Sequence, residues 1–500
     1  MKLKKVWSSL LVAAMTFSLA ACGNGNSGTA ENAGSAENVG NTENVADNVS
    51  ASGETKEITV AIPCMSDMEY ADDVQNAINE IAEERYGIKY NFEFISYGNW
   101  SQQSNLLLTG DEVDVIAAFI TPLSTYVKNG QFVDLTNYVN NASDEFKEIW
   151  TEDDLYGTSV QGSIYAIPTY KNYGSCAGLM IDATIAEEMG VKDRQVWTLA
   201  DISDFLYDVA EKYPDRYPLV PNGNSMISYW SWDGLGDSSY VGVLTDRGQD
   251  TTVQNLYDTD DFQEICKYTR QWYQNGLILP DVLSNTESGS EMIRAGKAVS
   301  TFAKFANGDE PGCYLTIVED AWSEANCYNV SYGINANAKD KDAAWKALEI
   351  LYTDLDVRTL LVQGIEDVTY VDNGDGTISY IDGKSATESG YGMPTMYWIL
   401  PNANGTTPID SYGTGFYEEI EAFNADTLKS KAYGFYFNTT EVSDQYTACI
   451  NVMNKYTQAL LSGTVDVEST IEQADSELKA AGLNDVIEAK QAQLDAFLAQ

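Results

Sequence analysis

The chain has 500 residues, with 29 Lys and Arg, 75 Asp and Glu and no histidine, which gives a formal net charge of −46 at pH 7. A chain this acidic cannot neutralise phosphates, and this excludes nucleic acid as a partner. The absence of histidine excludes Ser-His-Asp and Cys-His nucleophilic sites, imidazole metal ligands and HExxH proteases.

The start of the chain has the pattern of an export signal. Three lysines lie within the first five residues, and the apolar run at residues 10–21 that follows them is too short to span a bilayer. Residues 19–22, Leu-Ala-Ala-Cys, have the form of a lipobox, in which the cysteine thiol receives diacylglycerol before cleavage. We therefore predict a signal peptide over residues 1–21 and a lipid anchor at Cys22. The alternative is an ordinary secretory signal with an incidental cysteine.

Residues 22–56 have the composition of a flexible tether. They are mostly Gly, Ser, Asn, Ala, Thr and Glu, and such a segment cannot bury enough apolar surface to offset the entropy cost of ordering. Ordered structure is predicted to begin near Glu57. The tether would hold a folded domain at the extracellular face of the cytoplasmic membrane, because that is the location an anchor at Cys22 implies.

The first part of the ordered chain predicts an α/β lobe. Apolar residues alternate at positions 58, 60 and 62, as in a strand, and a helical pattern opens at residues 72–73 and closes at Gly87. Residues 90–95 form a second predicted strand. The continuous apolar run at residues 115–120 is expected for a strand covered by helices on both faces. The pattern indicates a largely parallel sheet.

Helices dominate the rest of the pattern. Thr198 is placed to cap a helix that ends by Pro214, and another helix is predicted over about residues 342–352. Residues 371–380 predict a hairpin. The chain after Ser443 is almost wholly helical, with breaks at glycines 463 and 482. An ordered region of about 440 residues exceeds a single core, which predicts two or three lobes.

The remaining polar motifs predict neither a metal nor a cofactor. The cysteines match neither a CxxC pair nor a small disulfide framework, so most are predicted to be buried, and a Cys313–Cys327 disulfide is left open. Residues 374–376, Gly-Asp-Gly, suggest a calcium loop, but Val371 stands where that loop requires an acidic ligand. A tight hairpin turn is the favoured interpretation.

Several segments, in order and spacing, resemble motifs of the family 1 extracellular solute-binding proteins, the group that includes maltose-binding protein. They are residues 108–116 (LTGDEVDVI), 162–168 (GSIYAIP), 274–281 (QNGLILPD), 295–299 (AGKAV) and 332–335 (YGIN). Residues 434–440 (GFYFNTT) and 478–483 (LKAAGL) resemble the uncharacterised C-terminal domain of a Gram-positive lipoprotein subgroup of that family.

This resemblance implies an α/β, two-lobed periplasmic-binding-protein-like fold (type II), with a ligand cleft between lobes that close by hinge motion. By analogy, lobe 1 holds residues 57–168 and 328–400, and lobe 2 holds residues 169–327 and 401–500 with its helical C-terminal region. The hinge would lie at residues 165–169. The implied function is that of a monomeric, lipid-anchored receptor that binds an oligosaccharide without chemistry and hands it to the permease subunits of an ABC importer.

Two other functions stay open from the sequence. One is a surface carbohydrate-active enzyme that uses two carboxylates, although 75 carboxylates make a pair at any spacing expected by chance. The other is a receptor for a peptide or another solute, because a fold does not fix its ligand.

Candidate ligand-binding residues are selected by position, because composition does not discriminate among 32 Tyr and 10 Trp. Sugars are bound by flat apolar faces and by polar groups that take several hydroxyls, and open α/β sheets bind ligands beyond the carboxyl ends of their strands. For each candidate the alternative is a place in the core or on a solvated loop. The candidates are Asp67, Tyr70, Phe119, Tyr170, Tyr173, Trp230, Trp232, Asp233, Phe302, Phe305 and Trp398.

The densest aromatic and acidic cluster is residues 229–233, Tyr-Trp-Ser-Trp-Asp, in a Gly-rich stretch. If these aromatics line the cleft, replacing Trp230 or Trp232 by Ala should abolish binding and leave melting nearly unchanged. A large stability loss with affinity retained would place them in the core.

Overall fold

The computed structural model describes residues 54–499, except positions 66, 122, 161, 193–195, 228–229, 306–311 and 326–329. The predicted signal peptide, the Cys22 anchor and almost all of the tether therefore lie outside the described residues, as do Tyr229 and Cys327. Regular structure begins at Lys56, one residue before the predicted position. Among the described helices, none is both long and apolar enough to cross a membrane.

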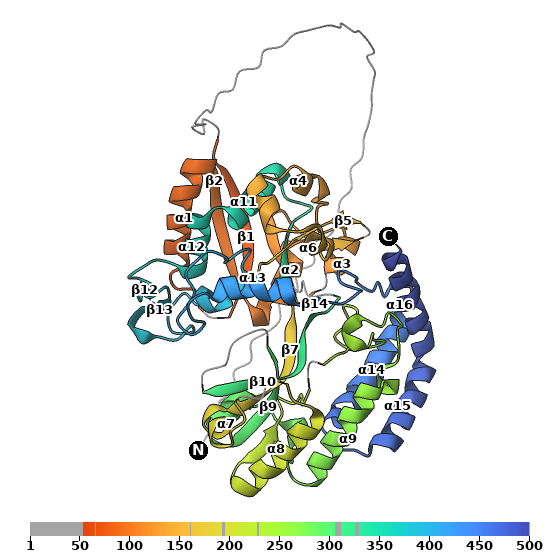
Figure 1. Cartoon of the computed structure of the whole chain (residues 1–500). Coiled ribbons are helices and arrows are strands. Elements are labelled where there is room, and N and C mark those ends of the chain that lie inside the picture. The colour runs from red at the N-terminus through yellow and green to blue at the C-terminus, as the bar shows by residue number, and fades with distance from the viewer. Residues whose placement is uncertain are drawn as a thin grey trace, which may run out of the picture. The chain divides into compact units, whose positions relative to one another are not determined.

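The first lobe is built on a five-stranded sheet in the order β2-β1-β3-β11-β6 (Figure 1). The central β1 (Lys56–Cys64) is parallel to β2 (Ile88–Ser96) and to β3 (Val115–Phe119). The returning strand β11 (Val330–Ile334) runs antiparallel to β3 and to β6 (Ile167–Pro168). The prediction of a largely parallel sheet is confirmed, with β11 as the antiparallel member. The continuous apolar sequence of β3 follows from its burial on both faces.

Helices cover this sheet, and their ends follow local sequence rules. Asp72 and Asp73 lie in the first turn of α1, where they complement the helix dipole, and Gly87 ends the helix with φ 66°. The hairpin β12–β13 forms as predicted, between Tyr370–Asp372 and Ile378–Tyr380. The helices are α1 (Ala71–Tyr86), α2 (Tyr97–Leu107), α3 (Leu123–Lys128), α4 (Thr136–Asn140), α5 (Asp144–Ile149), α6 (Glu152–Tyr156), α11 (Lys341–Thr353), α12 (Leu355–Gln363) and α13 (Phe416–Asp426).

The second lobe has a sheet in the order β14-β10-β7-β9-β8. Its central β7 (Ser175–Asp182) is antiparallel to β10 (Cys313–Ser323) and to β9 (Ala298–Phe305). The edge strands β8 (Tyr217–Val220) and β14 (Leu428–Lys429) are parallel to β9 and β10, respectively. This sheet is therefore mixed.

The helices of the second lobe include the three C-terminal helices, which run along one side of it (Figure 1). Thr198 caps α8 with a capping box completed by Asp201. Gly463 has to be glycine, because an added Cβ would lie 2.2 Å from the carbonyl oxygen of Thr269. The helices are α7 (Ala183–Glu188), α8 (Leu199–Lys212), α9 (Asp260–Gln274), α10 (Gly289–Arg294), α14 (Ser443–Leu461), α15 (Val467–Ala481) and α16 (Leu483–Leu498).

Each sheet has its own main hydrophobic core, and the two cores divide the chain at a different point from the one predicted. Phe416, Tyr417 and Ile420 of α13 pack in the first core, whereas the segment from Ala432 onward packs in the second. The third crossing between lobes therefore follows α13 and does not lie near residue 400. The reason is aromatic packing, because Tyr397 holds α13 with ring centroids 5.1 Å and 5.9 Å from Phe416 and Tyr417.

The chain crosses between the lobes after β6, after β10 and after α13, and residues of these crossing segments lie against one another. An added Cβ at Gly174, on the first crossing, would lie 2.3 Å from Cγ2 of Thr427 on the third and 3.2 Å from the carbonyl oxygen of Trp322, near the end of β10. The side chain of Asn424 ties the same region, accepting from the N–H of Tyr173 at 2.9 Å. The predicted hinge at residues 165–169 adjoins this junction.

Cys64, Cys176, Cys266 and Cys449 are buried free thiols, as predicted for most of the cysteines. Burial raises the pKa of Cys64 to about 11, with the Asp67 carboxylate adding to the shift. These side chains therefore act as small core residues and not as reactive thiols.

Candidate ligand-binding site

A cavity of about 460 Å³ lies between the two lobes, where both contribute walls. The first lobe supplies the end of β3, residues 120, 121, 123 and 124, and Ser331 of β11, and the second supplies residues of the loop at 233–242. Its volume falls within the range of about 300–1,000 Å³ usual for small-molecule sites. The carboxyl end of β3 is also where an open α/β sheet places its ligands.

One wall is the ring of Phe119, held by other aromatic side chains. Its ring centroid lies 4.9 Å from that of Tyr97 and 6.2 Å from that of Trp398. The indole N–H of Trp100 donates to the Phe119 carbonyl at 3.0 Å. The next residue, Ile120, has φ 66° and is 57 % exposed, a strained conformation for a β-branched residue that is typical of binding sites. The ring is thus half-buried and fixed in place at the cavity.

Polar groups lie opposite this apolar wall. Lys304 and Glu324 form an ion pair of 3.5 Å, and both line the cavity. Ser331 also lines the cavity, but on the first-lobe side, where it pairs with Ala118 of β3. Its hydroxyl is buried and has no hydrogen-bond partner among the described residues. Because an unpaired buried hydroxyl is costly, a hydrogen bond from a bound ligand would stabilise this group.

Two carboxylates shape the second-lobe wall. Asp233 is fully buried and accepts from the backbone N–H groups of Leu235 at 2.8 Å and Ala325 at 2.9 Å. Burial raises the pKa of Asp233 to about 6, and the nearby Glu324 carboxylate adds to this rise. Hydrogen bonds to Asp233, including one from Ser430, lower the pKa and offset part of the rise. Since both oxygens of Asp233 are engaged by backbone groups, this residue holds the loop in shape.

The second of these, Asp237, is used in the same way. Its carboxylate accepts from the N–H groups of Ser239 at 2.8 Å and Val241 at 2.9 Å. The side chain of Glu324 is 24 % exposed, compared with 4 % for Asp237. Of the acidic groups at the cavity described above, Glu324 is therefore the one most open to a ligand.

Comparison with known families identifies this architecture. The model of the bacterial extracellular solute-binding proteins matches residues 76–354, more than half of the chain. The chain belongs to this family. A second model, a domain of unknown function (DUF3502), matches residues 431–499, which include all three C-terminal helices.

Relatives of this solute-binding protein agree with the assignment. A carbohydrate ABC transporter substrate-binding protein from Streptococcus pneumoniae serotype 4 is 26% identical over 519 residues, covering 99% of this chain and 98% of the relative. The crystal structure of an N-glycan transport solute-binding protein from Streptococcus pneumoniae superposes with a TM-score of 0.78 at 21% identity, covering 89% of this chain and 99% of that chain. The same protein in complex with Man1GlcNAc gives a TM-score of 0.70 at 20% identity, covering 89% and 100%. The predicted family and the two-lobed α/β fold are confirmed.

The structure brings two of the predicted ligand-binding residues of the solute-binding protein to the cavity, Phe119 and Asp233. Trp398 lies behind Phe119 and supports its ring. Phe305 is part of β9, but its side chain lies outside the described residues. Ligand contact by these residues stays a prediction.

Three residues that were predicted to line the cleft lie instead in the core of the second lobe. Trp230, Trp232 and Phe302 are 5%, 3% and 6% exposed. The ring of Trp230 lies 6.5 Å from that of Trp232 and 6.2 Å from that of Phe302. They pack in the second core beside Phe262 and Trp272, so their burial contributes to stability.

The other predicted residues lie away from the cavity lining. Asp67 is exposed. The ring of Tyr70 packs against Gly390, so closely that an added Cβ there would lie 2.8 Å from it. Tyr170 lines a separate cavity of about 330 Å³. The hydroxyl of Tyr173 donates to the carbonyl of Thr169 at 2.9 Å, which uses its polar group within the crossing.

The cavity-lining residues that sequence analysis missed include Glu324, Ser331 and Tyr436. Glu324 follows β10 directly, so the strand-end rule could have found it if β10 had been recognised. Ser331 lies inside a strand and carries no local signal. Tyr436 belongs to the motif at residues 434–440, but its place at the cavity depends on packing between segments far apart in sequence.

Proposed function

We propose that this solute-binding protein captures a neutral oligosaccharide in the cavity between its lobes and delivers it unchanged to the permease subunits of an ABC importer. The observation that carries the proposal is the fixed Phe119 ring on the first-lobe side of a cavity whose second-lobe side carries the polar side chains of Lys304 and Glu324. A sugar ring presents both an apolar C–H face and hydroxyl groups, so it satisfies both walls together.

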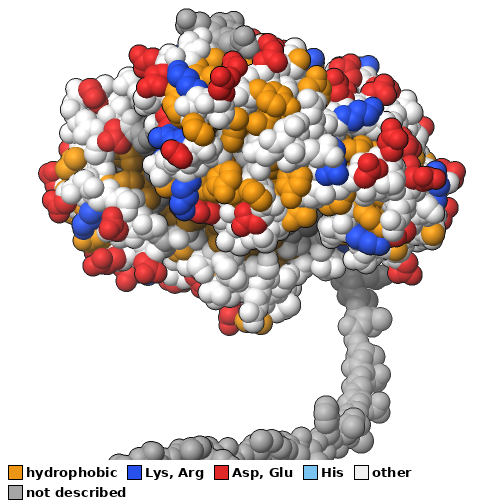
Figure 2. Space-filling view, turned by 90° about the horizontal axis from the view of Figure 1, so that it is seen from below, with side chains coloured by type: hydrophobic (Ala, Val, Ile, Leu, Met, Phe, Trp, Pro, Cys, Tyr) orange, Lys and Arg blue, Asp and Glu red, His pale blue; other side chains and the backbone are white. Residues whose placement is uncertain are grey.

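The charges around the cavity favour a neutral ligand. Lys304 is paired with Glu324, Asp237 is paired with Lys490, and Asp233 adds a further carboxyl group. The whole chain carries a net charge of −46, and Figure 2 shows Asp and Glu side chains spread over the visible face. Anionic sugars would meet a repulsive field at this protein. The names of the relatives, which include a carbohydrate transporter protein and a complex with Man1GlcNAc, support a carbohydrate ligand.

The geometry gives less support to the alternative of a carbohydrate-active enzyme. The carboxylates of Asp233 and Asp237 are engaged by backbone N–H groups. A glycosidase needs two carboxyl groups free to act on the substrate, one as an acid and one as a base or nucleophile. Membership of a solute-binding family also favours binding without chemistry.

A glycan panel read by thermal shift tests the proposal. The chain from residue 23 onward would be melted with Man1GlcNAc, kestose and other neutral oligosaccharides, and with an oligogalacturonate as the anionic comparison. A ligand at about 100 times its Kd stabilises the folded state by about 2.7 kcal/mol, so a bound sugar raises the Tm. Sustained consumption of a sugar that binds would overturn the receptor function. An upshift with the anionic sugar alone would overturn its neutral specificity.

The proposal includes a location. A lipid anchor at Cys22 and a tether over residues 22–56 would hold the monomeric receptor at the extracellular face of the membrane. Labelled palmitate should be incorporated into the wild-type protein, and Cys22→Ser should abolish the label and release the protein into the medium. A Cys22→Ser protein that stays in the membrane fraction would argue against the anchor.

A further inference from the structure

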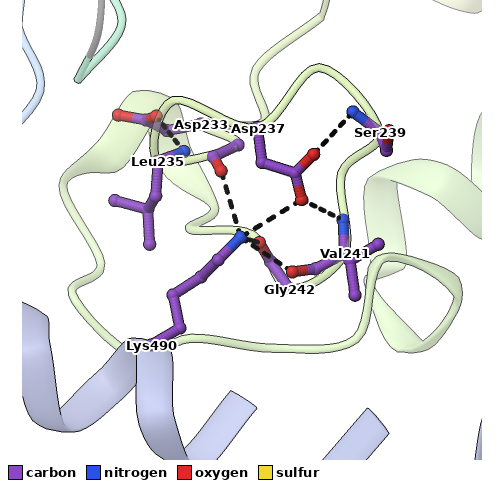
Figure 3. A network of polar contacts seen from close by, with 8 residues as sticks. Asp233, Leu235, Asp237, Ser239, Val241, Gly242 and Lys490 are labelled. Carbon is purple, nitrogen blue, oxygen red and sulfur yellow. Dashed lines mark hydrogen bonds and ion pairs between the residues drawn. The ribbon is translucent and has the colours of Figure 1, made fainter. Parts of the chain in front are cut away.

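Lys490 is a fully buried lysine that the C-terminal helix α16 inserts against the loop at residues 233–242 (Figure 3). Its ammonium donates to the carbonyls of Val241 at 2.7 Å, Gly242 at 2.9 Å and Gly234 at 3.2 Å. An ammonium has three N–H donors and no acceptor. The three carbonyls of the loop therefore match the number of its donors.

The same ammonium lies 3.4 Å from Oδ2 of Asp237, the carboxylate at the centre of the loop. That carboxylate also accepts from the backbone N–H groups of Ser239 and Val241, so all of these groups converge as Figure 3 shows. Burial lowers the pKa of Lys490, and the Asp237 carboxylate opposes the shift. The pair links α16 to the loop through groups that are both removed from water.

The loop backbone is in a conformation that requires support from outside it. Leu235 and Tyr240 have φ values of 58° and 55°, in the left-handed region that side chains disfavour. Gly234 is closely surrounded, because an added Cβ would lie 2.2 Å from the carbonyl oxygen of Asp237. Such a turn persists only where neighbouring contacts fix it, and Lys490 provides four of them.

This loop forms part of the ligand cavity, whereas Lys490 does not line it. Gly234, Asp237, Ser238 and Tyr240 are all lining residues. The domain of unknown function at residues 431–499 thus reaches the cavity in two ways. It contributes Tyr436 directly, and it holds the loop from behind through Lys490.

We propose that Lys490 is a positioning residue for ligand binding, and that the C-terminal domain serves to fix the loop at residues 233–242 as the second-lobe wall of the cavity. Removing the ammonium leaves three carbonyls and a buried carboxylate without their partner. The loop should then sample other shapes, and the cavity should lose its preformed wall. The effect on affinity rests on the proposed function, but the effect on loop order does not.

Hydrogen exchange of the ligand-free chain tests loop order. Lys490→Met removes all donors at this position, and Lys490→Gln retains some of them and serves if the first variant fails to fold. Lys479→Met is the matched control, because Lys479 is an exposed lysine of the same domain. Amides of the loop should exchange faster by about tenfold or more in Lys490→Met, and by less in Lys490→Gln, with β7 and β10 unchanged. Unchanged loop exchange, or faster exchange of the loop and both strands together, would overturn the proposal.

Calorimetric titration with Man1GlcNAc and the neutral panel is the second arm. If the wild type binds a sugar, Lys490→Met should weaken it by about tenfold or more while Lys479→Met leaves it unchanged. Equal affinity of Lys490→Met and the wild type would overturn the positioning role. If the wild type binds none of the sugars while loop exchange rises as described, the oligosaccharide proposal fails and the loop-fixing role stands.

Discussion

Trp232→Ala tests whether the aromatic cluster beside the cavity stabilises the fold or contacts the ligand. The indole is 3% exposed, and its ring centroid lies 5.6 Å from that of Phe262, 6.4 Å from that of Tyr240 and 6.5 Å from that of Trp230. Truncating a buried Trp loses its transfer free energy and leaves a void, at a cost of about 3–5 kcal/mol. In a lobe of this size about 1 kcal/mol shifts the Tm by roughly 2–4 °C, so the second lobe should melt roughly 6–20 °C lower.

The assay is thermal and urea unfolding followed by far-UV circular dichroism, with sugar titration at a temperature where the variant is folded. Trp232→Phe is the control, because the indole N–H of Trp232 has no hydrogen-bond partner among the described residues and a phenyl ring keeps most of the packing. This variant should melt closer to the wild type, and both variants should keep measurable affinity. An unchanged Tm together with lost binding in Trp232→Ala would refute the core placement and restore the cleft prediction.

Three further predictions follow from other sites. Ser331→Ala removes a hydroxyl that has no partner among the described residues, so it should leave the Tm unchanged and weaken sugar binding by about 2- to 12-fold; unchanged affinity in a titration would show that the hydroxyl does not contact the ligand. The pKa of Asp233 is raised to about 6 from 3.8, so its contribution to stability is present below pH 3.8 and is lost as the pH rises to about 6. Urea unfolding should show a loss on the order of 3 kcal/mol over that window, and Asp233→Asn should lack that slope. Asp354 caps α12 by accepting from the N–H of Val357. Burial raises the pKa of Asp354, but hydrogen bonds from donors that include Tyr86 outweigh burial and hold the pKa below 3.8. Asp354→Ala should cost about 1–2 kcal/mol at pH 7, and the difference from wild type should shrink as the pH falls below 3.8; an equal difference at low pH would contradict the carboxylate's role.

Local patterns predicted the three parallel strands of the first lobe, its helices α1 and α11, its hairpin and the C-terminal helices. The run at residues 115–120 gave β3, and the glycines at 87, 463 and 482 marked helix boundaries. These signals work because they depend on neighbours in sequence: a strand buried on both faces is apolar throughout, and a helix that ends in the left-handed conformation favours glycine. The same logic placed Phe119 correctly at the end of a strand on the cavity.

Predictions failed where the outcome depended on packing between distant segments. Trp230 and Trp232 belong to an aromatic and acidic cluster of the kind expected at a sugar site, but both are buried in the core. Whether an aromatic side chain faces a cleft or a core depends on what covers it. The third crossing was placed near residue 400 because nothing in the sequence shows that α13 packs on Tyr397. Ser331 gave no signal, since a serine within a strand looks the same whether its hydroxyl is paired or not.

The sequence by itself determined the acidic character, the exclusion of histidine chemistry, the parallel strands of the first lobe and the C-terminal helices, and its motifs gave the resemblance that identified the family. All of these except the family follow from composition or from contacts within one helix or strand. The tertiary structure alone decided which residues form the cavity, and it brought Asp237 and Lys490 together from positions 253 residues apart in the sequence. Burial and hydrogen-bond partners are properties of the folded chain, because the same residue type can stabilise the core, hold a loop or meet a ligand according to its surroundings.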